Sequence, residues 1–146
     1  MAEKTIYPVD NEYQPDKKFS FQNPATLHDT ITRKKYILDK KGNYIIGRKD
    51  ESIPQKQRAT IEIIPQSRNG QGEAVEKKYE YMNPRHIVIV VEKYDEFYYH
   101  KVKVLEKANP IIADNKILTD KDDYFYLKPG SIICLPLVRI EVLDQQ

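Results

Sequence analysis

Cysteine is nearly absent from this chain of 146 residues and occurs once, at Cys134. A single cysteine excludes an internal disulfide, so the fold must be held together by its core. Cys134 lies within an apolar run, which is typical of a small buried side chain rather than of a reactive thiol. This cysteine usage is typical of a reducing compartment, and we expect a cytoplasmic protein.

Long apolar segments are also missing. The first thirty residues contain no apolar stretch of the kind that a secretory signal requires. The longest apolar run, Ile132 to Val138, is interrupted by Pro136, whereas a transmembrane helix needs roughly 20 apolar residues. We therefore expect no membrane association.

An excess of one charge is lacking as well. The chain has 24 lysines and arginines against 22 aspartates and glutamates, a formal net charge of +2. That balance is too small to indicate nucleic-acid binding by itself. Tyrosines are interleaved with lysines between Tyr94 and Lys103. This pattern leaves a small β-barrel that binds single-stranded nucleic acid as the alternative interpretation.

The usual motifs of catalysis and metal binding do not occur in the sequence. There is no glycine-rich phosphate loop, no closely spaced histidine pair and no Cys/His cluster with ligand spacing. His28, His86 and His100 are far apart along the chain. We therefore expect a non-enzymatic protein with no metal, no cofactor and no small-molecule substrate.

What the sequence does contain is a series of short β-strand patterns. Apolar residues cluster or alternate in short segments separated by turn residues, and no segment of helical length has a 3.6-residue period. The strand patterns cover residues 31–38, 44–47, 60–64, 86–91, 97–105, 116–118, 124–127, 132–135 and 138–143. Many short strands of this kind predict an all-β sandwich or barrel.

The organisation of the chain changes near residue 30. Residues 1–29 contain three prolines and scattered apolar residues without a period, which predicts an extended or flexible arm. Residues 30–146 are long enough for one β domain. Within it, Asp39 to Asn43 has the composition of a hairpin turn, and Gln66 to Lys78 that of a long loop.

Five short motifs follow one another in order: Gly47-Arg48, Asn83 to His86, Asn109 to Ile111, Lys116 to Leu118, and Leu127 to Ile133. This ordered set resembles the forkhead-associated (FHA) domain, in which Gly-Arg, Ser-x-x-His, Asn-Gly-Thr and Leu-x-x-Gly-Asp-x-Ile follow one another. The resemblance covers about residues 30–143. It implies an FHA-like β-sandwich of about eleven short strands, which binds phosphothreonine peptides through the loops at one end.

The resemblance also implies roles for individual residues. Arg48 matches the arginine that contacts phosphate, and an arginine offers the planar fork that a phosphate dianion needs. Asn83 occupies the place of the phosphate-binding serine, and Arg85 adds a cation beside it. Asn109 matches the asparagine that hydrogen-bonds the peptide backbone. The candidate phosphopeptide site is therefore Arg48, Asn83, Arg85 and Asn109.

Two further residues match positions that support this site. Gly47 is expected to pack beneath the loop, and His86 to buttress the loop from inside. The chain also departs from the family pattern, because Pro84 lacks a backbone N–H and residues with hydroxyl groups or glycine are replaced at Ala108, Pro110 and Ile111.

Two versions of an interaction module follow from these residues. In one, the loop end of the sandwich binds a phosphothreonine or acidic segment of a partner protein. In the other, the site has degenerated and the domain is a phospho-independent assembly scaffold. In the scaffold version, Pro110 to Ile112 and the N-terminal arm would form the contact surfaces.

Overall fold

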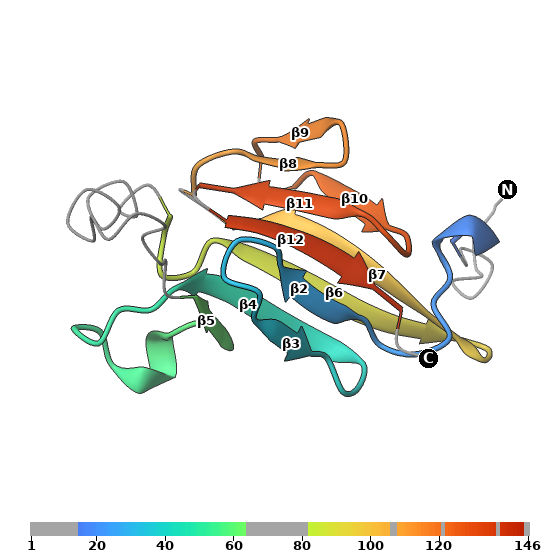
Figure 1. Ribbon diagram of the computed structural model, residues 1–146, viewed down its shortest axis with the longest axis horizontal. Coiled ribbons are helices and arrows are strands. Elements are labelled where there is room, and N and C mark those ends of the chain that lie inside the picture. Colours follow the sequence, from blue (N-terminus) through green and yellow to red (C-terminus); the bar gives the residue numbers. More distant parts are fainter. Residues whose placement is uncertain (1–14, 64–81, 106–107, 121, 137, 145–146) are drawn as a thin grey trace, which may run out of the picture.

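The chain forms a β-sandwich in which two sheets pack face to face (Figure 1). The computed structural model describes residues 15–63, 82–105, 108–120, 122–136 and 138–144. In these ranges, 11 strands form two sheets, which confirms the predicted FHA-like all-β sandwich of about eleven strands. The helices found in the same ranges are short 3-10 turns, η2 (Lys17–Phe19) and η3 (Gln55–Gln57). Neither is long enough or apolar enough to cross a membrane.

The five-stranded sheet has the order β10-β7-β6-β4-β5, and the six-stranded sheet the order β3-β2-β12-β11-β8-β9. The first consists of β4 (Gly42–Arg48), β5 (Ile61–Ile63), β6 (Ile87–Tyr94), β7 (Phe97–Val104) and β10 (Tyr124–Leu127). The second consists of β2 (Thr26–Asp29), β3 (Lys35–Ile37), β8 (Ile111–Ala113), β9 (Lys116–Leu118), β11 (Ile132–Leu135) and β12 (Val138–Leu143). All pairs are antiparallel except β4 and β5, which run parallel.

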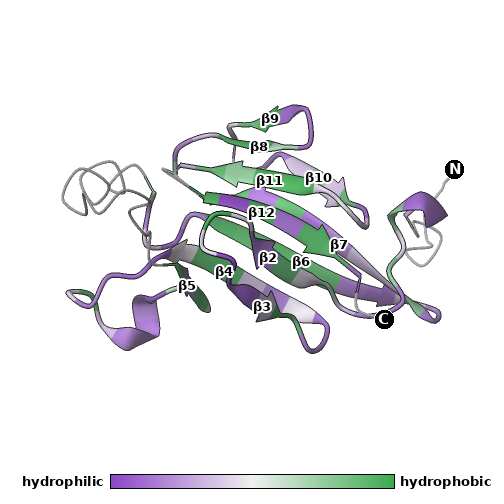
Figure 2. Cartoon of the chain, viewed as in Figure 1, coloured by the Kyte–Doolittle hydropathy of each residue, from purple (hydrophilic) through white to green (hydrophobic). Residues whose placement is uncertain are grey.

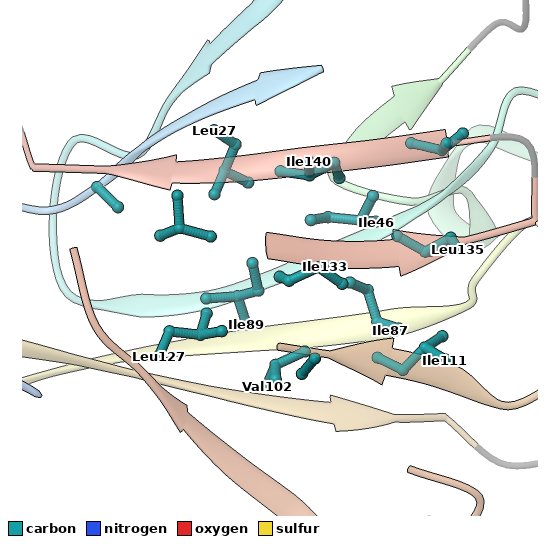
Figure 3. Packing of buried hydrophobic residues seen from close by; sticks show 14 of the residues in the cluster. Leu27, Ile46, Ile87, Ile89, Val102, Ile111, Leu127, Ile133, Leu135 and Ile140 are labelled. Carbon is teal, nitrogen blue, oxygen red and sulfur yellow. The ribbon is translucent and has the colours of Figure 1, made fainter. Parts of the chain in front are cut away.

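The core lies between the two sheets and follows the two-residue alternation of the strands. In β6, Ile87 and Ile89 point inward, and in β12, Val138, Ile140 and Val142 share the inner face. Figure 3 shows side chains of both sheets meeting in this layer, and Figure 2 shows the hydrophobic stretches on the central strands. Each fully buried aliphatic side chain contributes about 1.5–3 kcal/mol.

The domain begins earlier in the sequence than the predicted boundary at residue 30. Residues Thr26–Asp29 form strand β2 inside the six-stranded sheet, paired with β12 and β3. Phe21 is fully buried and exchanges two backbone hydrogen bonds of 2.8 Å with Tyr98. The sequence does not reveal this strand, because a strand of four residues is too short to show a two-residue period. Residues 1–14, the remainder of the predicted arm, lie outside the described residues.

The predicted hairpin at Asp39 to Asn43 is instead a crossover between the sheets. β3 lies at the edge of the six-stranded sheet, whereas β4 belongs to the five-stranded sheet. The Tyr44 hydroxyl fixes this crossover by donating to the Lys40 carbonyl (2.7 Å) and contacting Asp39 Oδ1 (3.0 Å). A Gly-Asn turn composition fits both connections, so the sequence pattern alone does not distinguish them.

The predicted strand at residues 31–38 is shorter than expected. Asp29 Oδ1 accepts hydrogen bonds from the backbone N–H groups of Ile31 (2.9 Å) and Thr32 (3.1 Å), and so turns the chain. The strand starts only at Lys35. The predicted long loop, Gln66 to Lys78, lies outside the described residues.

Candidate binding site at the loop end

Three segments meet where β4 ends and where β6 and β8 begin. We call this part of the sandwich the loop end and define it by residues 48–58, 83–86 and 108–110. Its backbone is tied together by hydrogen bonds from Arg48 N to Asn83 O and from His86 N to Ile46 O, both 2.9 Å. The structure thus brings together the Gly-Arg, Asn-Pro-Arg-His and Asn-Pro motifs of the sequence.

Gly47 permits the close approach of two of these segments. A Cβ atom at this position would lie 2.0 Å from the carbonyl oxygen of Pro84 and 2.8 Å from the nitrogen of Arg85. Both neighbours are backbone atoms, so they cannot move aside as a flexible side chain would. Only glycine allows β4 to pass beneath the loop at this distance.

His86 connects the second loop to the third from inside. Its side chain is fully buried, and its Nδ1 accepts a hydrogen bond from Asn83 N–H at 3.0 Å. In that tautomer Nε2 carries the hydrogen and donates to the Asn109 carbonyl oxygen at 2.8 Å. Burial lowers the pKa of His86, and the Asn109 carbonyl opposes this only in part. The neutral ring therefore acts as a structural link between the loops.

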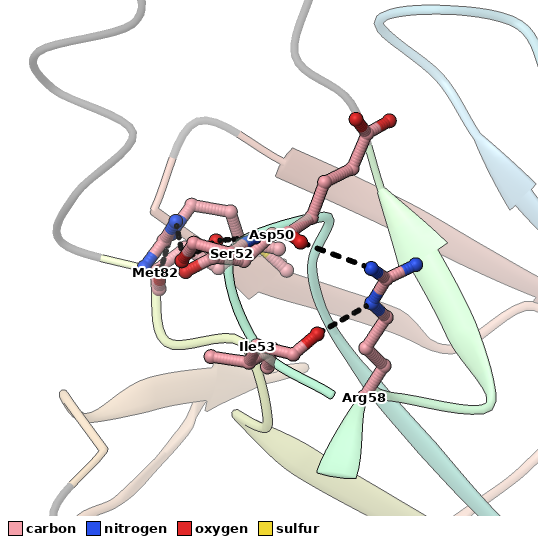
Figure 4. A network of polar contacts seen from close by, with 7 residues as sticks. Asp50, Ser52, Ile53, Arg58 and Met82 are labelled. Carbon is pink, nitrogen blue, oxygen red and sulfur yellow. Dashed lines mark hydrogen bonds and ion pairs between the residues drawn. The ribbon is translucent and has the colours of Figure 1, made fainter. Parts of the chain in front are cut away.

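Arg48 is already engaged at the loop end, by contacts with Met82 and Asp50, which Figure 4 labels. Its Nε donates to the Met82 carbonyl oxygen at 2.9 Å, which fixes the plane of the guanidinium group. Its Nη1 lies 3.3 Å from Asp50 Oδ2, with about a quarter of the arginine side chain exposed. The arginine is thus held in place and carries an internal carboxylate on one side of its fork.

Asp50 is fixed in turn by the loop that follows β4. Its Oδ1 accepts hydrogen bonds from the backbone N–H and the hydroxyl of Ser52. These two bonds lower the pKa of Asp50, and Arg48 lowers it further. Arg58 closes the same loop by donating to the carbonyl oxygens of Ile53 and Glu51, both at 3.1 Å. Asp50 is therefore an ionised, positioned partner of Arg48.

The motif comparison did not identify Asp50, Ser52, Met82 or Arg58 as parts of this site. The Asp50-x-Ser52 spacing is the one local signal, because an aspartate often turns the chain by bonding the N–H two residues on. The contact of Arg48 with the Met82 carbonyl depends on the path of two distant segments and leaves no pattern in the sequence.

The remaining predicted residues surround this centre. Arg85 is exposed, Asn83 is half-buried, and Asn109 is exposed while its carbonyl oxygen is bound by His86. Ile111 does not belong to an open apolar loop, because it is 1% exposed and starts β8. Ile112, the next residue, does face solvent.

The loop end offers arginine cations rather than ligands for a metal. Arg48 is paired with Asp50, and Lys49 Nζ lies 3.4 Å from Glu51 Oε1. Within the described ranges, Lys56, Arg58 and Arg85 make no ion pair with a carboxylate, and of these three Arg85 lies on the 83–86 loop beside Asn83. Within those ranges, no three His, Cys, Asp or Glu side chains gather as a metal site would require. The chemistry on offer is charge-assisted hydrogen bonding to an anion.

Comparison with known proteins relates the fold, but not the sequence, to FHA domains. Neither a protein-family model nor a curated protein matches the chain. An FHA domain studied for its phosphothreonine-dependent interactions superposes with a TM-score of 0.56 at 19% identity, covering 84% of this chain and 97% of that one.

Two further solved structures agree with this result. The FHA domain of a hypothetical protein from Arabidopsis thaliana superposes with a TM-score of 0.60 at 14% identity, covering 87% of this chain and 91% of that one. The MEK1 FHA domain in complex with a phosphothreonine peptide of HOP1 gives 0.56 at 17% identity, covering 85% and 99%. The chain therefore has the FHA-domain fold.

Proposed function

We propose that this chain is a non-enzymatic protein-interaction module whose loop end binds an acidic or phosphorylated segment of a partner protein. The observation that carries the proposal is the Asp50 carboxylate held 3.3 Å from the Arg48 guanidinium. This ion pair shows where an anionic group is bound at the loop end. An acidic group of a partner would displace the Asp50 carboxylate and bind the Arg48 guanidinium in its place.

A phosphate group suits this exchange because it brings more charge than the carboxylate it displaces. It carries about −1.5 to −2 charges and three strong acceptor oxygens, whereas Asp50 offers one charge. Arg48 would bind it through the Nη groups while its Nε keeps the bond to Met82. Arg85, exposed on the adjacent loop, supplies a second cation.

The similar structures support this proposal. One is a complex with a phosphothreonine peptide, and another was studied for phosphothreonine-dependent interactions. Both have the sandwich described above at low sequence identity. They contain nothing that favours the single-stranded nucleic-acid alternative. The ligand that we propose is therefore a partner protein rather than a small molecule.

We also propose that the protein acts in the cytoplasm. Its single free thiol supports this, because such cysteine usage is typical of a reducing compartment.

The proposal is tested with an array of phosphothreonine peptides and their unphosphorylated counterparts. We expect the wild type to bind a subset of the phosphorylated peptides, and Arg48→Ala to bind them at least tenfold more weakly, since a hydrogen bond to a charged group contributes about 1.5–3 kcal/mol. Arg48→Lys keeps the charge but loses the fork, so it should recover little. Lys35→Ala, at an exposed position of β3 outside the loop end, is the control. Equal binding of both peptide sets would refute phosphate recognition.

A second candidate is a phospho-independent scaffold, which two observations favour. Pro84 offers no backbone N–H to a phosphate, and Ile112 and Ile117 form an exposed cross-strand pair, 43% and 62% exposed, on β8 and β9. In this version a bound partner survives phosphatase treatment and Arg48→Ala but is released by Ile117→Glu. Release by Arg48→Ala would contradict it.

A further inference from the structure

A hollow of about 670 Å³ lies away from the loop end, between turn η2, the β8–β9 turn and strand β10. In Figure 1, turn η2, the β8–β9 turn and the end of β10 lie toward the right, whereas β4 ends on the left. The side chains that matter here are Lys18, Phe19, Lys116, Phe125, Tyr126 and Lys128. Its size falls in the range of ligand-binding pockets, about 300–1,000 Å³.

The framework of this groove is a hydrogen-bonded network around Asp114. Its Oδ2 accepts from the Ser131 hydroxyl (2.9 Å) and its Oδ1 from the Ile132 N–H (3.0 Å). The Ser131 hydroxyl also accepts from the Lys128 N–H at 2.9 Å. The β8–β9 turn, which leads into Lys116 at the start of β9, is thereby fixed to the β10–β11 turn, which carries Lys128. Both carboxylate oxygens of Asp114 are already bonded within this network.

The groove has an aromatic side whose position is also fixed. The rings of Phe19 and Tyr126 lie 5.8 Å apart between centroids. Turn η2, which carries Phe19, is capped by the Asp16 carboxylate, which accepts from the Lys18 N–H at 3.0 Å. Just beyond it, Phe21 is fixed to β7 by its two bonds with Tyr98. The rings of Phe19 and Tyr126 therefore form a preorganised aromatic surface on which an aromatic ring of a ligand could pack.

The charge around this aromatic surface is positive. Lys18, Lys116 and Lys128 contribute three ammonium groups, and within the described ranges of the chain none of them forms an ion pair with a carboxylate. Lys18 Nζ lies 5.1 Å from the centroid of the Phe19 ring. Because the acceptors of Asp114 are used internally, an anion entering the groove meets unpaired cations beside apolar rings.

We propose that this groove is a second binding site, for an acidic peptide segment that carries an aromatic side chain. The aromatic ring packs on Phe19 and Tyr126, and flanking carboxylates reach Lys116 and Lys128. Lysines are point charges on flexible stems, which suits carboxylates spread along an extended segment better than a single bidentate anion. The site is separate from the loop end, because Asn109 precedes β8 whereas Asp114 and Lys116 follow it.

The test titrates unlabelled peptides of glutamates around one phenylalanine into the ¹⁵N-labelled chain, followed by NMR and calorimetry. We expect shifts of the amides of Phe19, Lys116 and Lys128, and weaker binding when glutamines replace the glutamates or alanine replaces the phenylalanine. The double variant Lys116→Glu/Lys128→Glu should bind about tenfold more weakly, since each exposed charge contributes up to about 1 kcal/mol.

The matched control is Lys34→Glu/Lys41→Glu, which changes the net charge equally at exposed positions outside both proposed sites. If both double variants weaken peptide binding equally, the effect is due to the overall charge of the chain, and the proposed groove site is refuted. Tighter binding of a single-stranded oligonucleotide than of any acidic peptide would overturn the assignment to a peptide. In Arg48→Ala the amides of Phe19, Lys116 and Lys128 should still shift as in the wild type, whereas binding of phosphothreonine peptides at the loop end is lost. Failure here and failure of the loop-end proposal, on which this inference does not rest, are therefore distinguishable.

Discussion

Arg48 connects the packing of the loop end with its chemistry. The bond from Nε to the Met82 carbonyl oxygen orients the guanidinium group, and the ion pair with Asp50 occupies part of its fork. An incoming anion therefore meets an arginine that is already aligned and already paired. The affinity of the site should depend on Asp50 as well as on Arg48.

The first prediction concerns this competition. Asp50→Asn removes the negative charge opposite Arg48, while its amide oxygen still accepts from the Ser52 N–H. We expect the affinity for phosphothreonine peptides, or for inorganic phosphate, to rise about threefold, as an exposed ion pair is lost. Calorimetry measures the change, and Glu51→Gln, which releases Lys49 instead, is the control. If both variants bind alike, Asp50 is not a competitor.

Gly47 gives a prediction about stability. In Gly47→Ala the new methyl group would overlap the Pro84 carbonyl, so the 83–86 loop must shift. We expect a loss of roughly 1–3 kcal/mol in the free energy of unfolding, the usual cost of overpacking. Urea denaturation gives the number, and amide shifts of residues 83–86 locate the change. An unchanged midpoint with unchanged spectra would show that the loop has room that the structure does not reveal.

At the scale of single residues, the sequence predicted which motifs meet at the loop end, but not which contacts hold Arg48 in place. The order of Gly47-Arg48, Asn83 to His86 and Asn109 predicted a shared site, and the structure brings these residues together. Asp50 and Met82 were not predicted, because their contacts with Arg48 depend on how two loops pass each other. That path is determined by the whole sandwich rather than by a local pattern.

At the scale of the secondary-structure elements, one side chain, that of Asp114, holds the turn after β8 against the turn after β10. Asp114 has a φ of 53°, in the left-handed region, and its carboxylate fixes both turns to each other through Ser131 and Ile132. Aspartate and asparagine tolerate this backbone conformation better than most other residues do. The side chain at this position therefore decides both the shape of one turn and its attachment to the next.

The prediction for these elements follows directly. Asp114→Ala should lower the free energy of unfolding by about 2 kcal/mol, since hydrogen bonds to a charged acceptor are lost and alanine is strained at positive φ. Asp114→Asn, which keeps one acceptor and the backbone preference, should lose less than half as much. Chemical denaturation of both variants measures the difference. Equal losses would mean that charge alone, and not the turn conformation, makes this residue important.

At the scale of the whole molecule, closure of the sandwich leaves an uncharged histidine in its core. His100 is fully buried, contacts Phe21 with ring centroids 4.2 Å apart, and accepts the Ala25 N–H at Nε2 (2.9 Å). Its Nδ1 is buried with no recorded partner. Burial lowers the pKa of His100 to about 3.

This gives a pH dependence of stability with a defined sign. The unfolded chain takes up a proton at His100 near its ordinary pKa of about 6.5, whereas the folded chain does so only near 3. The free energy of unfolding should therefore stay constant above a pH of about 6.5, fall as the pH drops from about 6.5 to about 3, and level off below that. Between pH 7 and 5 this histidine should account for a loss of about 2 kcal/mol.

His100→Gln is the matched variant, because glutamine can still accept the Ala25 N–H but does not titrate. Urea denaturation at pH 7, 6 and 5 should give a flatter profile for the variant than for the wild type. His86, whose pKa is lowered in the same direction, is present in both proteins and cancels in the difference. Parallel profiles would show that His100 takes up its proton without cost to the fold.

The fold class was predictable from the sequence, whereas the path of the chain was only partly so. Alternation in Val138 to Val142 and the apolar run from Ile87 predicted core strands, because burial on one face imposes a period of two. Strand β2 and the crossover before β4 were missed. A strand of four residues shows almost no period, and a turn composition does not tell whether the next strand returns to the same sheet.

The length of strand β8 has a consequence for how a partner would engage this domain. Asn109 at the loop end and Asp114 at the groove are five residues apart along extended chain, which corresponds to about 17 Å. A partner with two acidic stretches separated by fewer than roughly five residues cannot reach both sites at once. One with a longer flexible spacer would gain avidity, because the second contact becomes intramolecular. Peptides that differ only in spacer length should therefore show a step in affinity at that separation.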